Sequence, residues 1–208
     1  MKRFAFLALL GAFAVGQADM LNFDDVDTNG SAVSLGNSYH GLFISGDLAA
    51  ADNGYYNLYY NNNLSFPSAP NAAFNGAGIT QIDLLSNQPS SIRTNNAATF
   101  NFSGLDASTW ADNNAFYAYS STSITVQGFL NGNLVGQSSM NLNGDGTFSH
   151  LSGFAGQIDD LRILNDGVDG HWWLVDNINT DAAVPEPASM AALGLGVAAL
   201  LRRRTKKA

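Results

Sequence analysis

The chain has 208 residues, no cysteine and a formal net charge of −8. All 17 acidic residues lie between Asp19 and Pro187, but only two of the nine basic residues do, Arg93 and Arg162. This central part therefore carries a charge of −15. Such a charge excludes nucleic acid as a partner, and the lack of cysteine excludes disulfides, thiol catalysis and a lipoprotein anchor.

Residues 1–18 have the features of a secretory signal peptide. Lys2 and Arg3 precede a mostly apolar run from Phe4 to Val15, and small residues follow where signal peptidase cleaves its substrates. We predict cleavage after Ala18, which leaves Asp19 as the mature N-terminus. The alternative is an N-terminal membrane anchor, although the apolar run is short for a bilayer core of roughly 30 Å.

Between the two ends the sequence favours strands, because Asn, Gly, Ser, Thr and aromatic residues dominate and strong helix formers are scarce. Asn131-Gly132 predicts a hairpin with a type I′ turn. Short runs separated by turn residues predict about ten antiparallel strands and no helix, and therefore one all-β domain over residues 19–183, an antiparallel β-sandwich with a jelly roll as the preferred topology. The predicted strands are 21–23, 41–45, 55–60, 79–85, 98–102, 123–131, 134–141, 147–152, 159–164 and 172–178.

Aromatic and amide side chains suggest a glycan-binding surface. Tyr55, Asn57 and Tyr59 would share one face of a strand, and flat rings beside amides are what a sugar-binding face uses. Trp110 and Trp173 are candidates for the same role. We favour the alternative interpretation, in which one tyrosine face packs in the core and the other lies on the surface.

The last 25 residues combine three different features in a fixed order. Val184-Pro185-Glu186-Pro187 is extended because its prolines fix the backbone, and a run without charge follows from Ala188 to Leu201. As a helix this run spans roughly 21 Å, less than a bilayer core, but the basic side chains of Arg202, Arg203, Arg204, Lys206 and Lys207 can reach the interface. We therefore predict a transmembrane helix rather than a core helix.

In this order of features the tail resembles the PEP-CTERM sorting signal of Gram-negative bacteria. The resemblance implies that an exosortase, a membrane-embedded cysteine transpeptidase, recognises the residues from Val184 to Pro187. It also implies an intermediate in the inner membrane, followed by delivery to the cell surface or to the exopolysaccharide matrix. It indicates a destination and no catalytic activity.

Four interior motifs resemble a recurrent passenger domain of PEP-CTERM proteins, itself similar to jelly-roll, carbohydrate-binding-module-like sandwiches. They are Leu21–Val26, Pro70–Asn75, Val126–Gly132 and Val175–Ile178. The resemblance implies a binding or matrix domain whose first and last strands lie together and share a structural calcium ion.

The residues themselves leave the calcium site open. Trp172, Leu174, Asp176 and Ile178 would share one face, so Asp176 would lie among apolar side chains and need a cation or several donors. Oxygen atoms of Asp24 or Asp25 with those of Asp176 would suit Ca²⁺. The alternative is that the aspartates near residue 25 form a solvated turn and that Asp176 accepts hydrogen bonds from a loop.

Two functions are compatible with these features. The preferred one is an exported, non-catalytic surface or matrix protein that binds exopolysaccharide, because no catalytic motif is found. The alternative is a secreted hydrolase acting on matrix polysaccharide.

Arg162 and Asp160 would lie on one side of their strand and form a solvent-facing pair, whereas Asp159 would face the other side.

Overall fold

The structure, a computed structural model, describes residues 19–36, 38–45, 48–58, 64–75, 90–94, 99–111, 117–168 and 170–182. The predicted signal peptide, the strand expected at 79–85, Tyr59 and the tail from 183 onward lie outside these residues. Within the described part, no helix is long and apolar enough to cross a membrane.

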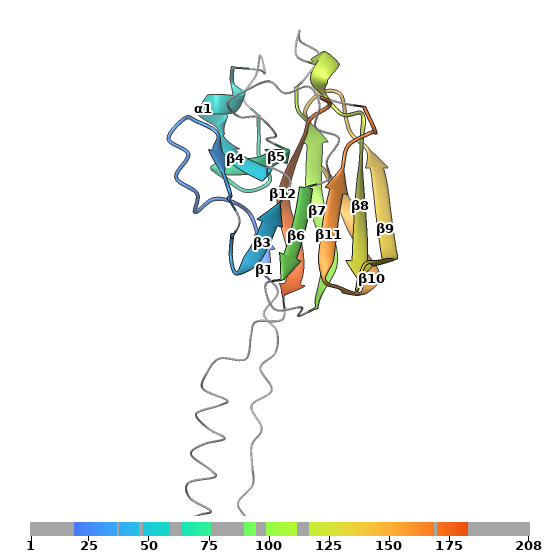
Figure 1. Cartoon of the computed structure of the whole chain (residues 1–208). Helices are drawn as coiled ribbons and strands as arrows, with labels where there is room; N and C mark the ends of the chain where they lie inside the picture. Colours follow the sequence, from blue (N-terminus) through green and yellow to red (C-terminus); the bar gives the residue numbers. More distant parts are fainter. Residues whose placement is uncertain are drawn as a thin grey trace, which may run out of the picture. The chain divides into compact units, whose positions relative to one another are not determined.

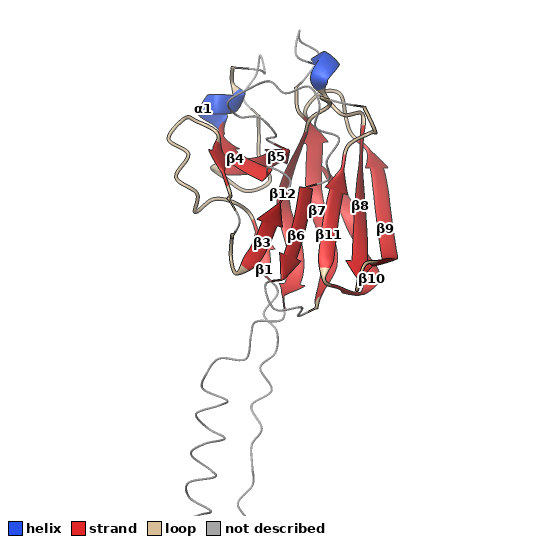
Figure 2. Ribbon diagram, in the orientation of Figure 1, coloured by secondary structure: helices blue, strands red, loops and turns tan. Residues whose placement is uncertain are grey.

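Two antiparallel sheets make up the domain (Figures 1 and 2). The seven-stranded sheet has the order β10-β7-β12-β5-β4-β2, with β1 also paired to β12, and the five-stranded sheet has the order β3-β6-β11-β8-β9. The strands of the first are β1 (Asp19–Leu21), β2 (Val33–Ser34), β4 (Leu48–Asp52), β5 (Asn71–Asn75), β7 (Phe100–Thr109), β10 (Ser149–Ile158) and β12 (Trp173–Ala182). Those of the second are β3 (Leu42–Ser45), β6 (Ser90–Thr94), β8 (Ser123–Leu130), β9 (Asn133–Asn141) and β11 (Asp160–Leu164).

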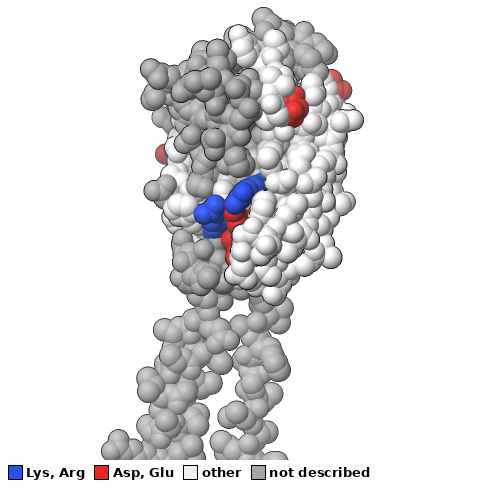
Figure 3. Space-filling view, turned by 45° about the vertical axis from the view of Figure 1, so that its right-hand side comes forward, with Lys and Arg blue, Asp and Glu red and all other residues white. Residues whose placement is uncertain are grey.

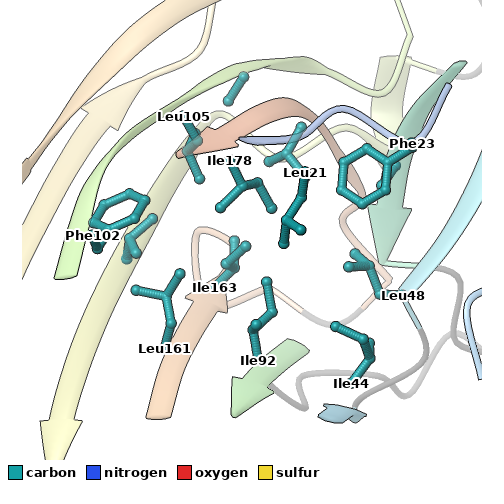
Figure 4. Close-up of a cluster of buried hydrophobic side chains, with 14 of the residues drawn as sticks. Leu21, Phe23, Ile44, Leu48, Ile92, Phe102, Leu105, Leu161, Ile163 and Ile178 are labelled. Carbon is teal, nitrogen blue, oxygen red and sulfur yellow. The ribbon is translucent and has the colours of Figure 1, made fainter. Parts of the chain in front are cut away.

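The main core lies between the two sheets (Figure 4). Leu21, Leu105 and Ile178 from the seven-stranded sheet face Ile92 and Leu161 from the five-stranded sheet, and all five side chains are buried. Alternation along β8 and β11 places one set of side chains in this core and leaves the other on the outer face. The predicted antiparallel β-sandwich is therefore confirmed.

The strands that the sequence predicted best are those with clear alternation. Segments 41–45, 123–131, 134–141, 159–164 and 172–178 correspond to β3, β8, β9, β11 and β12. Asn131 and Gly132 have φ values of 51° and 77°, as a type I′ turn requires, so the predicted hairpin is confirmed. Residues 143–146 also form a turn, but it joins β9 to β10 in the other sheet and is not a hairpin within one sheet.

The strand expected at residues 55–60 is wrong for residues 55–58, the part of it that the structure describes. Residues Asn53–Tyr56 form the short helix α1, which begins after Asp52 because this side chain caps it by accepting a hydrogen bond from the backbone N of Tyr55 at 3.1 Å. The alternation of tyrosines resembled a strand, but the cap and the preceding strand β4 determine the local conformation.

The prediction missed β4 and β5 because neither strand alternates. Their residues are alanine-rich and are buried on both faces, since one face contacts the core between the sheets and the other contacts a second apolar cluster. A strand buried on both sides has no polar face, so period-two analysis does not detect it.

Candidate functional site

Two of the interior motifs are joined by the side chain of Asn71, which is fully buried in β5. Its Nδ2 donates hydrogen bonds of 2.8 Å to the backbone oxygens of Phe23 and Val26, and its backbone N donates to Asp24 Oδ1 at 3.1 Å. The amide is therefore satisfied by the turn that follows β1, and Asn71 fixes the path of residues 22–26 against the seven-stranded sheet.

The last motif joins the same region through the pairing of β1 with β12, in which Leu21 lies opposite Ile178. The predicted proximity of the first and last strands is confirmed. Asn177 has a φ of 48° and interrupts the register with β7 between Asp176 and Asn179. Strict alternation had predicted that Ile178 shares the face of Asp176. Because this bulge shifts the alternation, Ile178 instead lies in the core between the sheets.

Asp176 is fully buried, at 0% exposure, as the sequence predicted. One carboxylate oxygen accepts hydrogen bonds from Ser68 Oγ at 2.9 Å and from the Asn177 backbone N at 2.7 Å. The other accepts from the Ser68 backbone N at 2.8 Å and from Ser68 Oγ at 3.0 Å. Burial raises the pKa of Asp176 to about 6; these hydrogen bonds oppose the rise, and the charge of Asp24 adds to it.

Of the predicted calcium ligands, Asp24 lies close enough to Asp176 for its charge to raise the pKa of Asp176, whereas Asp25 has other partners. Asp25 accepts hydrogen bonds from the Tyr39 hydroxyl at 2.6 Å and from His40 Nε2 at 3.0 Å, and these partners lower the pKa of Asp25. Asp24 is the neighbour of Asp176, but the oxygens of Asp176 are already used by N–H and O–H donors. Among the described residues, no three His, Asp or Glu side chains are grouped closely enough to hold a metal ion. Asp176 accepts hydrogen bonds from a loop, as the alternative expected, and the calcium site stays a prediction.

Two residues of the predicted aromatic platform, Tyr55 and Trp110, lie in a second apolar cluster on the outer side of the seven-stranded sheet, whereas Trp173 belongs to the main core. Trp110 and Trp173 are 0% and 1% exposed, so neither ring has a face for a sugar, and the glycan-binding prediction fails for these two residues. Trp110 packs edge-on against Trp172, with 4.8 Å between ring centroids. Tyr55 is half-buried against Phe74, with 6.1 Å between centroids, which agrees with the core interpretation. Asn57 is exposed at the end of α1, and Tyr59 lies outside the described residues.

The outer face of the five-stranded sheet holds an ion cluster that the sequence did not predict. The carboxylate of Asp160 accepts hydrogen bonds from Ser91 Oγ and from Arg162 Nε at 2.8 Å. It also forms an ion pair with Arg93, whose Nε lies 3.2 Å from Asp160 and donates a hydrogen bond to Ser91 Oγ. Burial of Asp160 opposes its ionisation, but these hydrogen bonds outweigh burial and lower its pKa. The expected solvent-facing pair is thus partly wrong: Arg162 does reach Asp160, but Asp160 is buried and a second arginine joins it.

Sequence alternation could place Asp160 and Arg162 on one face of β11. It could not supply Arg93, because that contact depends on the register of β6 against β11, in which Arg93 lies opposite Asp160. The composition could have indicated this contact, because Arg93 and Arg162 are the only permanent cations between Asp19 and Pro187 and a buried carboxylate would need one of them.

Comparison with protein families gives the assignment of the C-terminal region. A family described as the PEP-CTERM protein-sorting motif matches residues 183–204, which contain the Pro-Glu-Pro motif, the apolar run and three arginines. The chain carries a PEP-CTERM sorting signal. This confirms the resemblance stated from the sequence. A PEP-CTERM signal implies export, sorting at a membrane and processing by an exosortase.

Two further comparisons concern the chain as a whole. No curated protein matches it. A crystal structure of a Stig cyclase, Fisc, from Fischerella sp. TAU is 11% identical, with a TM-score of 0.45 and coverage of 79% of this chain and 97% of that chain. Similarity at this level supports no assignment of activity.

Proposed function

We propose that this chain is an exported, non-catalytic protein of the cell surface or extracellular matrix, and that its β-sandwich binds exopolysaccharide. The observation that carries the proposal is the PEP-CTERM signal at residues 183–204, because it delivers the domain to the outside of the cell. The fold supports a binding role, since the five-stranded sheet has an outer face with polar side chains such as Gln127 and Gln137 joined by a hydrogen bond.

The proposed route uses both ends of the chain. Signal peptidase cleaves between Ala18 and Asp19, and the apolar run before Arg202, Arg203 and Arg204 holds the chain in the inner membrane as an intermediate. Exosortase then acts near Pro185, Glu186 and Pro187.

Sorting is tested by replacing Glu186→Ala together with Pro185→Ala and Pro187→Ala in the producing cell. We expect the variant to remain in the membrane fraction with its basic tail intact, as it should in a strain without exosortase. Pro67→Ala is the matched control, because Pro67 is an exposed proline inside the domain. Normal release and processing of the triple variant would refute the sorting role.

Binding is tested by incubating the exported chain with matrix polysaccharide extracted from the same cells. We expect the chain to sediment with the polysaccharide without releasing reducing ends. Release of reducing ends that is lost on substitution of a single aspartate would instead identify a hydrolase. Absence of any co-sedimentation would contradict the binding role.

A further inference from the structure

The outer face of the five-stranded sheet presents polar side chains in rows that run across the strands. The strand register places Ser91 of β6 opposite Arg162 of β11, Arg162 opposite Gln127 of β8, and Gln127 opposite Gln137 of β9. These four side chains therefore form one row that crosses four strands. At about 4.8 Å between strands, the row is about 14 Å long.

The next row contains the charged and apolar members of the face. Arg93 lies opposite Asp160, Asp160 opposite Phe129, and Phe129 opposite Leu134, which is 52% exposed. The guanidinium carbon of Arg162 lies 4.1 Å from the centroid of the Phe129 ring. The face thus places hydrogen-bonding groups beside an apolar strip, which is the combination that a sugar chain with hydroxyl and C–H surfaces requires.

Both arginines are held in place but remain accessible. Their hydrogen bonds within the described part of the chain use Nε, and the side chains of Arg93 and Arg162 are 47% and 33% exposed. Asp160 and Phe129 restrict the rotamers of the two guanidinium groups, so less conformational entropy is lost when an anion binds. The terminal Nη atoms can donate paired hydrogen bonds to a carboxylate or a sulfate.

The charges of the domain support an anionic ligand at this place. Arg93 and Arg162, the two permanent cations of the exported domain, both pair with the buried carboxylate of Asp160 (Figure 3). The local charge is therefore about +1, in a domain whose net charge is −15. A dense polyanion such as DNA, with one charge per roughly 1.7 Å, would meet the surrounding acidic surface. A polysaccharide with one anionic group per sugar or fewer would not, because a Debye length of about 8 Å screens the more distant aspartates at physiological ionic strength.

We propose that this face binds an acidic polysaccharide, with Arg93 and Arg162 holding a carboxylate or sulfate group of the sugar chain and Gln127 and Gln137 bonding its hydroxyl groups. The proposal rests on the proposed matrix function and adds the binding face and the ligand class to it.

The first test changes the ligand and leaves the protein intact. The exported chain is run by affinity electrophoresis through gels that contain a uronic-acid polysaccharide, the same polymer after reduction of its carboxyl groups, a sulfated polysaccharide, and its desulfated form. A chelator is present throughout, so that divalent cations cannot bridge acidic protein and acidic sugar. We expect retardation by the carboxylated or the sulfated polymer and at least tenfold weaker binding to its neutral counterpart. The arm that shows retardation identifies the anionic group.

The second test changes the arginines. Arg162→Gln and Arg93→Gln should each weaken binding about tenfold, and Arg162→Lys should restore only part of it, because lysine keeps the charge but loses the planar fork. The matched control is Asn29→Asp, at an exposed position between β1 and β2 of the other sheet, which makes the same change in net charge outside the four strands of the row. It should leave binding unchanged. Thermal unfolding of each variant verifies that it is folded.

Two results would overturn the proposal while leaving the matrix function intact: equal binding to the charged and neutral polymers, or retention of full affinity in folded Arg162→Gln and Arg93→Gln variants that still bind matrix polysaccharide. A dimer in sedimentation that dissociates in Arg162→Gln would show that the arginines hold a second copy of the chain, and would also overturn it. Failure to bind any polysaccharide, including the extracted matrix, would refute both the proposal and the proposed function.

Discussion

Replacement of Asp176 by asparagine gives a quantitative test of the buried carboxylate. The pKa of Asp176 is raised from the ordinary 3.8 to about 6, so the ionised side chain costs the folded domain about 3 kcal/mol relative to its neutral form. Because the folded value exceeds the unfolded one, the folded state binds the proton more tightly. The resulting stabilisation is fully present below pH 3.8 and is lost as the pH rises through about 6.

From about pH 7 down to about pH 5, Asp176 should therefore raise the free energy of unfolding by about 1 kcal/mol. Asp176→Asn removes this contribution and keeps the shape of the side chain, so the difference between the two proteins isolates one titration from all others. The assay is urea unfolding at a series of pH values in the presence of a chelator. The exposed Asp27→Asn variant is the control and should follow the wild type.

Parallel curves for the wild type and Asp176→Asn across this range would refute the reasoning, since they would mean that Asp176 is either solvated or paired with a cation. Five aspartates whose pKa values are lowered make a contribution of the opposite sign: Asp25, Asp52, Asp145, Asp160 and Asp166. Their stabilisation is present above the unfolded value of 3.8 and is lost as the pH falls below it, outside the range of this test.

Three further predictions follow from packing, polar contacts and ligand chemistry. Gly136→Ala should lower the free energy of unfolding by about 1–3 kcal/mol, because the new Cβ would lie 2.2 Å from the ring of Phe154. Denaturant unfolding measures this change, and an unchanged free energy would show that the ring of Phe154 does not pack against Gly136. Asn71→Ala should cost about 2–4 kcal/mol, because the buried backbone oxygens of Phe23 and Val26 lose their donor; a loss below about 1 kcal/mol in thermal unfolding would show that water replaces it. A chelator should leave the melting temperature unchanged, because hydrogen-bond donors already occupy the oxygens of Asp176; stabilisation by added calcium would refute this.

Local patterns were sufficient wherever the determining contacts are close in sequence. The alternation of β8, β9 and β11 and the Asn131-Gly132 turn depend on residues within a few positions of one another, and all were predicted. The same reasoning failed at Tyr55, where a cap from Asp52 begins a helix, and in the alanine-rich β4 and β5, where two apolar layers remove the alternation.

The candidate site could be predicted only in part. That Asp176 would be buried followed from its apolar neighbours, but its hydrogen-bond donor Ser68 lies 108 residues away in the sequence. The burial of Trp110 and Trp173 depends on which elements cover them, and the contact of Asp160 with Ser91 spans 69 residues. Such pairs are set by strand register and by the bulge at Asn177, which a linear pattern does not reveal.

The sequence by itself determined the class of the domain and the sorting of the chain, because alternation, turn residues and the order of features in the tail are local properties that do not depend on folding. Only the tertiary structure decided which polar groups meet. It placed Asp25 on Tyr39 and His40, away from Asp176, and brought Arg93 and Arg162 to one carboxylate, because a buried charge must find its partners wherever the register of the sheets places them.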